Sequence, residues 1–210
     1  MIVLAIDTAL NACQAAVIDG GRTLAVLSEP MERGHQERLA PMVAQVMAAA
    51  GLGFDALERV GVTTGPGSFT GLRVGLAFAK ALALALDIPC VGIGGLRALA
   101  ASAPPFDGST AAVIDAKRGQ VYLQLFGPAG GASEPEARAI EDAVARLSNI
   151  QGLRLVGSGA AVLSDKLDAE VVPLIAPDPV VIGRLAAASP ATAAPPSPVY
   201  LRAPDARLPA

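Results

Sequence analysis

Residues 65–75 read GPGSFTGLRVG, a glycine-rich turn between a predicted strand at 60–64 and a predicted helix at 70–86 that Thr70 would cap. Such a turn presents unpaired backbone N–H groups at the start of the helix, which favours an anion. The P-loop pattern, however, needs Gly-Lys-Ser/Thr, and the chain has Gly71-Leu72-Arg73. Two interpretations stay open: an anion site, or glycines that let strand and helix backbones pack closely. Under either one, the residues concerned are Gly65, Gly67, Ser68, Thr70, Gly71 and Arg73.

The segments around this turn predict an α/β lobe. Strands at 2–6, 13–18 and 23–27 form an antiparallel meander, with Asp19-Gly20-Gly21 as a hairpin turn. Large apolar residues recur at helical spacing between residues 36 and 50, where Pro41 favours a kink over a break. Beyond the second helix, the pattern predicts a strand at 90–93 and a helix at 96–101.

Residues 102–109, which contain two prolines and Asp107-Gly108, predict a linker between residues 1–102 and a smaller second half, 103–210. That half is expected to hold a hairpin of strands 111–114 and 121–126, helices at 141–147, 160–167 and 180–188, and a strand at 153–156. Gly157-Ser158-Gly159 is interpreted as a structural turn in preference to a nucleotide loop. Residues 190–198 are rich in proline and alanine and predict an extended segment.

Composition narrows the function classes. The 210 residues are 52% hydrophobic, which is enough for a large buried core, and their net charge of −3 lacks the basic footprint of a domain that binds nucleic acid through its phosphates. The most apolar stretch, 74–86, is interrupted by Lys80 and is shorter than the ~20 residues of a membrane span, so no transmembrane helix is predicted. Without a positively charged leader at the N-terminus, we expect a cytoplasmic protein.

The reactive side chains predict no catalytic residue, metal or cofactor. Cys13 and Cys90 lie in predicted strands and are expected to be buried reduced thiols. One histidine, His35, cannot supply a pair of metal ligands, and a solvated or capping role is expected for it. A hydrolytic centre would need His35 as base, Ser68 or Thr70 as nucleophile and Asp7 as orienting group, and nothing in their spacing assembles these residues.

Sequence blocks across the chain resemble the TsaB family, also called YeaZ. The blocks are LAIDTA at 4–9, HQERL at 35–39, GPGSFTGLRVG at 65–75, DAKRGQVY at 115–122 and YLRAPDA at 200–206. The resemblance implies a degenerate member of the actin, Hsp70 and sugar-kinase superfamily. Its fold would be two-lobed α/β with a ribonuclease H-like motif and a reduced second lobe. Lys117, Arg118 and Arg202 match the family pattern, and the sequence offers no physical role for them.

The resemblance also implies a function. TsaB proteins act with the catalytic paralogue TsaD and with TsaE to install threonylcarbamoyl on the adenosine beside the anticodon of ANN-decoding tRNAs. The chain would then be a non-catalytic subunit that activates TsaD by heterodimerisation. Asp7 is followed by Thr8 and Ala9, side chains where the superfamily's first hairpin cradles phosphate with smaller residues, which argues against nucleotide binding. The alternatives are an ATP-dependent phosphotransferase, a glycoprotease-like peptidase of the same superfamily, or a direct RNA-binding module.

A docking surface is predicted on the two N-terminal helices. In the helix at 70–86, Arg73 and Lys80 fall on nearly one line and the other residues are apolar or small. Packing on one sheet needs only a ~100° apolar arc, so the excess would face a partner, unless the chain itself encloses the helix. The predicted partner-binding residues are Val74, Phe78, Leu82, Ala40, Ala44 and Met47. The resemblance implies a four-helix bundle with TsaD, or a homodimer when TsaD is absent.

Overall fold

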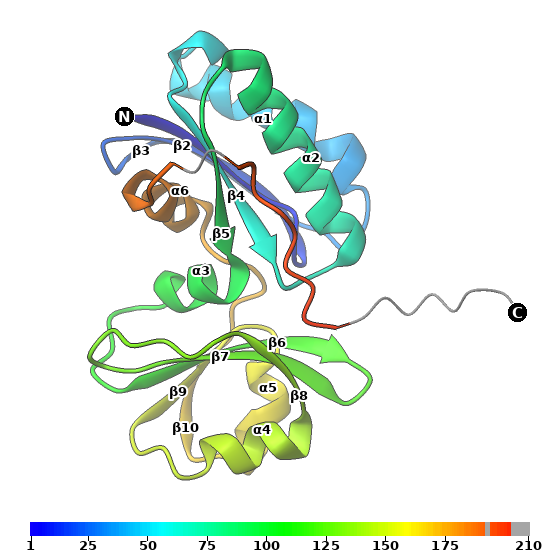
Figure 1. Ribbon diagram of the computed structural model, residues 1–210, viewed down its shortest axis with the longest axis vertical. Coiled ribbons are helices and arrows are strands. Elements are labelled where there is room, and N and C mark those ends of the chain that lie inside the picture. The colour runs from blue at the N-terminus through cyan, green and yellow to red at the C-terminus, as the bar shows by residue number, and fades with distance from the viewer. Residues whose placement is uncertain (192–193, 203–210) are drawn as a thin grey trace, which may run out of the picture.

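The computed structural model describes residues 1–191 and 194–202, which form two α/β lobes, one above the other in Figure 1. Each lobe contains a five-stranded mixed sheet, ordered β3-β2-β1-β4-β5 in the first lobe and β10-β9-β6-β7-β8 in the second. In the first sheet, β1 pairs antiparallel with β2 and parallel with β4. In the second, β6 pairs antiparallel with β7 and parallel with β9. The second lobe therefore repeats the central strand pairing of the first.

The strands of the first sheet are β1 (Ile2–Asp7), β2 (Ala12–Asp19), β3 (Arg22–Pro30), β4 (Arg59–Gly65) and β5 (Cys90–Gly94). Those of the second are β6 (Ser109–Lys117), β7 (Gln120–Phe126), β8 (Glu136–Ala139), β9 (Leu153–Val156) and β10 (Ala169–Val172). The α-helices are α1 (His35–Ala50), α2 (Phe69–Leu86), α3 (Gly95–Ser102), α4 (Ile140–Leu147), α5 (Ala160–Leu163) and α6 (Pro179–Ala188). Two short 3₁₀ helices are η1 (Phe54–Ala56) and η2 (Ser164–Lys166). The predicted helix at 160–167 is thus shorter, and its second half is the 3₁₀ turn η2.

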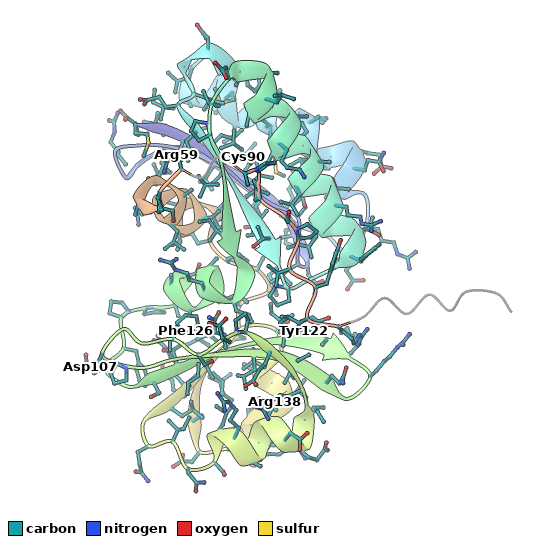
Figure 2. All side chains as sticks on the ribbon, in the orientation of Figure 1. Arg59, Cys90, Asp107, Tyr122, Phe126 and Arg138 are labelled. Atoms are coloured by element: carbon teal, nitrogen blue, oxygen red, sulfur yellow. The ribbon has the colours of Figure 1, made fainter. Side chains whose placement is uncertain are left out.

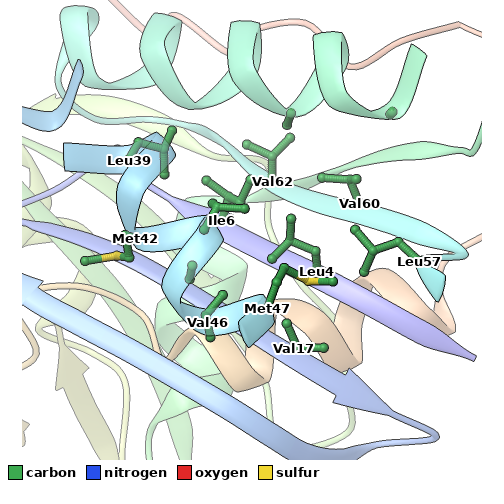
Figure 3. Packing of buried hydrophobic residues seen from close by; sticks show 14 of the residues in the cluster. Leu4, Ile6, Val17, Leu39, Met42, Val46, Met47, Leu57, Val60 and Val62 are labelled. Carbon is green, nitrogen blue, oxygen red and sulfur yellow. The ribbon is translucent and has the colours of Figure 1, made fainter. Parts of the chain in front are cut away.

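The first sheet is covered on both faces. Because side chains alternate along a strand, Leu4 and Ile6 of β1 point toward α1 and α2, and Val3 and Ala5 point toward α6. Figure 3 shows the first of these layers, in which residues of α1 pack over β1, β2 and β4. Its labelled members are Leu4, Ile6, Val17, Leu39, Met42, Val46, Met47, Leu57, Val60 and Val62. This layer fixes the positions of α1 and α2 on the sheet.

The C-terminal part of the chain departs from the predicted division into 1–102 and 103–210. Helix α6 returns to the first lobe, where Ile182 and Ala186 pack against the first sheet. Arg59 of β4 donates hydrogen bonds to the carbonyl oxygens of Ala186 at 2.6 Å and Ser189 at 2.6 Å, at the C-terminal end of the helix where a cation is favoured. Helical periodicity shows that α6 has a buried face, but it cannot say which sheet buries it.

A small apolar cluster joins the two lobes. Leu96 and Leu99 of α3 pack against Ile114 of β6, and Tyr122 and Phe126 of β7 border the same cluster (Figure 2). In Figure 1, α3 lies between the two sheets, and the C-terminal segment runs down the other side of the junction. The lobes are therefore in contact at α3.

Helix α2 is long and apolar enough, by length and composition alone, to cross a membrane, and 33% of it is buried in the fold. The sequence predicted no such helix because the apolar stretch was counted from residue 74, whereas the helix begins at Phe69. Leu72, Leu76 and Ala83 of this helix pack into the first lobe. One such helix is weak evidence of a membrane span, because a mostly buried core helix passes the same test of length and hydropathy.

Candidate functional site

The glycine-rich turn packs tightly against the turn between β1 and β2. Ser68 donates its backbone N–H to the carbonyl oxygen of Ala9 at 2.7 Å, and the Thr8 hydroxyl donates to the carbonyl oxygen of Gly71 at 2.7 Å. A Cβ atom at Gly71 would lie 2.0 Å from the Thr8 carbonyl oxygen, and one at Gly67 would lie 2.3 Å from that of Ala9. The chain's own backbone thus fills the space beside these glycines, which favours the close-packing interpretation of the turn.

The start of α2 differs from the prediction at the cap. Ser68, and not Thr70, is the N-cap residue, and its hydroxyl accepts a hydrogen bond from the Gly71 N–H at 3.3 Å. Arg73 contacts two aromatic side chains. Its guanidinium carbon lies 3.7 Å from the centre of the Phe69 ring, and its Nε donates to the Tyr200 hydroxyl at 3.3 Å. Arg73 was one of the residues proposed for an anion site. In the structure it contacts Tyr200 of the C-terminal segment.

Of the side chains considered for a hydrolytic centre, Asp7 has the most extensive hydrogen bonds. Asp7 is fully buried, and its carboxylate accepts hydrogen bonds from the Thr63 hydroxyl, from the Ala9 N–H at 3.0 Å and from Gln14 Nε2 at 3.3 Å. Burial raises the pKa of Asp7, although these hydrogen bonds and, slightly, the charge of His35 lower it. Gln14 also donates to the carbonyl oxygen of Pro177 at 2.9 Å, so Asp7 belongs to a buried network that reaches the connection between β10 and α6.

His35 is 7% exposed, which corrects the expectation of a solvated side chain. Its Nε2 is buried and has no hydrogen-bond partner among the residues that the structure describes. Cys13 and Cys90 are buried and unpaired as disulfides, and burial raises the pKa of both thiols to about 11. Across residues 1–191 and 194–202, no three His, Cys, Asp or Glu side chains gather in a group that could hold a metal ion.

A cleft of about 760 Å³ separates the lobes next to the glycine-rich turn. Its walls come from the β1–β2 turn, residues 66–69, the β6–β7 hairpin and residues 199–202 of the C-terminal segment. Lys117, at the tip of the hairpin, forms an ion pair with Asp115 at 2.8 Å. Burial raises the pKa of the Asp115 carboxyl, but the hydrogen bonds and charge of Lys117 lower it by more, so the pKa lies below its ordinary value. Lys117 and Arg118 both adopt positive φ angles, 61° and 56°, a strained conformation for side chains other than glycine.

The outer face of α2 is exposed and almost free of charge. Arg73, Ala77, Ala81 and Leu84 recur at three- and four-residue spacing and form an exposed stripe, in which Leu84 is 84% exposed. We call these four residues the α2 stripe. Val74, Phe78 and Leu82, which the sequence placed at the partner surface, are half-buried and pack against the first-lobe core. They lie beside the stripe and not at its centre.

On α1, Ala40 and Ala44 are exposed, as a docking surface requires. Met47 is only 1% exposed and belongs to the core, because it lies on the sheet-facing side of the helix with Val43. It is therefore removed from the candidate surface. Between the helices runs a groove of about 500 Å³. It is lined by Gln36, Leu39, Phe69, Thr70, Arg73, Val74, Ala77 and Phe78.

Sequence reasoning missed the place of the C-terminal segment. The Tyr200 ring lies 5.3 Å from the Phe69 ring, so a residue near the end of the chain contacts the first turn of α2. The block at 200–206 drew attention to Tyr200 and Arg202 without indicating what they contact. Ala203, Pro204, Asp205 and Ala206, the rest of that block, lie outside the described residues.

Comparison with known proteins places these features in a family. The model of the family described as TsaD, tRNA N6-adenosine threonylcarbamoyltransferase, matches residues 22–192. The chain is 36% identical over 126 residues to the tRNA threonylcarbamoyladenosine biosynthesis protein TsaB of Bacillus subtilis (strain 168), which covers 60% of this chain and 55% of that protein. Identity to the protein of the same name in Escherichia coli (strain K12) is 38% over 124 residues, covering 58% and 53%. The chain thus spans about half the length of the curated relatives it matches.

Solved structures share the whole fold. An uncharacterized protein with similarity to peptidase YEAZ from Pseudomonas aeruginosa superposes with a TM-score of 0.82 at 26% identity, covering 96% of this chain and 99% of that one. The activator of 2-hydroxyisocaproyl-CoA dehydratase from Clostridium difficile, solved with bound ADPNP, superposes with a TM-score of 0.58 at 9% identity, covering 89% and 94%. This second likeness shows the fold alone. The predicted fold class, a two-lobed α/β fold, is confirmed.

Proposed function

Since the chain belongs to the family that the TsaD model describes, and within it to the TsaB (YeaZ) family, we propose that it is the non-catalytic subunit of a tRNA-modifying complex. In this proposal it docks on TsaD through α1 and α2 and activates that enzyme. TsaD, acting with TsaE, then installs threonylcarbamoyl on the adenosine beside the anticodon of ANN-decoding tRNAs. The chain meets tRNA through the complex, and it works in the cytoplasm.

The observation that carries this proposal is the α2 stripe. Leu84 is 84% exposed and lies next to exposed alanines of the same helix. Covering this apolar surface with that of a partner would lower its free energy. Exposed Ala40 and Ala44 on α1 have short side chains, which allow another helix to approach closely. The groove between the two helices can take a ridge of side chains from that helix.

A protein of the same fold is the occupant that this surface fits best. A paralogue with the equivalent two helices presents a similar pair, and two such pairs form a four-helix bundle about an approximate twofold axis. The match of this chain to the TsaD family model supports that relationship. When TsaD is absent, we expect a second copy of this chain to cover the same face, which gives a homodimer.

The proposal that the chain lacks chemistry of its own rests on its side chains. The Asp7 carboxylate is occupied by Thr63, Ala9 and Gln14, and the Ser68 hydroxyl caps α2. The β1–β2 turn places Thr8 and Ala9, each 1% exposed, against the glycine-rich turn. This packing fills the space between the two turns, although both also line the cleft between the lobes.

The docking experiment uses Ala77→Glu, which puts a charge in the middle of the α2 stripe. Because Ala77 is exposed, the fold should be kept, whereas Phe78 and Leu82 contact the core and a charge there would also test folding. Burying a carboxylate in an apolar helix interface costs several kcal/mol, and Arg73 one turn away offsets only part of this cost, so we expect at least a 100-fold weaker affinity for TsaD by calorimetry.

The matched control is Ala145→Glu, an exposed helical alanine of α4 in the second lobe, which should bind TsaD as the wild type does. Equal binding by the Ala77→Glu and Ala145→Glu variants would place the interface elsewhere. The phosphotransferase alternative is tested in the same instrument, because it requires the isolated chain to bind Mg-ATP with micromolar affinity. The docking role requires no such binding.

A further inference from the structure

The C-terminal segment bridges the two lobes on the side of the cleft away from α3. Residues 194–202, which follow α6 in the sequence, run down the first lobe and reach the β6–β7 hairpin of the second lobe (Figure 1). In its path, the Val199 N–H donates to the carbonyl oxygen of Thr64 at 2.8 Å. A Cβ atom at Gly92 would lie 2.8 Å from Cβ of Pro196, so the segment is seated closely on the sheet edge. The segment therefore packs on the first lobe as part of the folded protein.

At the end of this path, two neighbouring side chains contact different lobes. Tyr200 packs its ring against Phe69 and accepts a hydrogen bond from Arg73, two residues that line the groove between α1 and α2. Arg202 reaches the second lobe, where its Nη1 donates to the carbonyl oxygen of Ala116 at 3.0 Å. The same nitrogen lies 3.5 Å from Oε1 of Gln120. Residues 200–202 therefore link the second lobe to one end of the groove between α1 and α2, which we call the docking groove.

The hairpin that Arg202 holds is a defined structure. Lys117 and Gln120 pair across a two-residue turn, Arg118-Gly119, whose residues both have positive φ, as in the hairpin turns that match strand twist. The Lys117 N–H donates to the Asp115 carboxylate at 2.8 Å, which fixes the position before the turn. Because Ala116 lies in β6 next to this turn, a bond to its carbonyl oxygen transmits the position of the second lobe to the C-terminal segment.

From these contacts, we propose that residues 199–202 are an interlobe latch that couples the closure of the cleft to the shape of the docking groove. With α3 joining the lobes at one side and the latch at the other, the cleft stays closed only while both hold. Opening the cleft pulls Tyr200 from Phe69 and Arg73, and disturbing the groove end releases the second lobe. This assigns Tyr200 and Arg202 as positioning residues for docking, and that part rests on the proposed function.

The latch is tested first on the isolated chain, without any partner. Spin labels at Ala49→Cys on α1 and Glu141→Cys on α4, both exposed, report the distance between the lobes, and buried Cys13 and Cys90 should stay unlabelled. We expect one narrow distance distribution when the two labelled cysteines are the only substitutions. The Arg202→Ala and Tyr200→Ala variants should broaden it, and Arg202→Lys, which keeps a cationic donor, should restore most of it.

Arg184→Ala is the matched control, because Arg184 donates to the carbonyl oxygen of Gly21 within the first lobe. It should leave the distance distribution unchanged. The coupling is read by hydrogen exchange of the amides of residues 69–75, which should become at least about 5-fold faster in Arg202→Ala although Arg202 contacts the other lobe. An unchanged distance distribution overturns the latch, and a broadened one with unchanged exchange overturns the coupling.

A third arm measures affinity for TsaD, where we expect the Arg202→Ala variant to bind about 10-fold more weakly than the Arg184→Ala control. If the wild type does not bind TsaD at all, the proposed docking role fails, and the distance and exchange measurements still decide the latch. Equal TsaD affinity for both variants contradicts the role of the latch in docking.

Discussion

Asp7 is a carboxyl group with no access to solvent, and its environment gives the fold a characteristic pH dependence. Burial raises the pKa of Asp7, with opposing effects from Thr63, Ala9 and Gln14. The folded chain therefore holds this proton more tightly than the unfolded chain. The resulting stabilisation is fully present below the ordinary aspartate pKa of about 4, and it is lost as the pH rises through the folded-state value.

We predict that the wild type loses stability relative to an Asp7→Asn variant as the pH is raised from about 4, because Asn does not titrate. Denaturant unfolding at a series of pH values gives the difference in free energy of unfolding, wild type minus variant. A difference that stays constant or grows with pH would show that the hydrogen bonds to the carboxylate outweigh its burial.

Gly71 tests the packing of the glycine-rich turn. A methyl group at this position would lie 2.0 Å from the Thr8 carbonyl oxygen, a backbone atom held in a buried turn. We predict that Gly71→Ala lowers the free energy of unfolding by about 2 to 3 kcal/mol, as overpacking does. The control is Gly131→Ala, where a Cβ atom meets no atom within 4 Å and the change should be below about 0.5 kcal/mol. Equal stability of the two variants in thermal unfolding would contradict the close approach.

At the scale of elements, Ser68 and Thr70 have different roles at the start of α2. Ser68 accepts the Gly71 N–H, whereas Thr70 lies inside the helix. We predict a loss of about 1 kcal/mol for Ser68→Ala and less than about 0.5 kcal/mol for Thr70→Ala, measured by chemical denaturation. The reverse order would mean that the helix begins at Thr70, as the sequence first indicated.

The strands and helices with strong periodicity were predictable from sequence, and the two edge strands of the second sheet were not. Strands β8 and β10 have four residues each and no fully buried position, so they lack the alternation that marks a half-buried strand. Helix α6 was predicted as a helix, but its place on the first sheet depends on a chain reversal between lobes that no local pattern encodes. The contacts of Tyr200 and Arg202 depend on that same reversal.

The exposed faces of α1 and α2 were predicted in outline, and their docking role stays a prediction. The low charge of α2 indicated an outward apolar face, and Ala40 and Ala44 of α1 are exposed as expected. Periodicity could not locate the boundary of the buried arc, which depends on where the neighbouring helix lies. Met47 is buried in the core for that reason, and Phe78 and Leu82 are half-buried beside the α2 stripe.

At the scale of the molecule, the two sheets repeat the same strand pairing, and the chain crosses between the lobes more than once. The first lobe carries the α2 stripe, the groove between α1 and α2, and the glycine-rich turn. The second lobe contacts the first through α3 and through the C-terminal segment. Nucleotide-binding members of a two-lobed fold bind their ligand between the lobes. Here the glycine-rich turn packs on one side against the backbone of the β1–β2 turn, and it also lines the cleft between the lobes.

The central claim is that this chain acts by docking on a catalytic partner. Its most direct test is threonylcarbamoyl modification of an ANN-decoding tRNA, reconstituted with TsaD, TsaE and this chain and followed by mass spectrometry of the nucleosides. With an activated threonylcarbamoyl donor and ATP in the mixture, we predict product formation with the wild type and with Ala145→Glu, at least 100-fold less with Ala77→Glu, and none when TsaD is omitted. Full modification with Ala77→Glu, or modification by this chain without TsaD, would contradict the account.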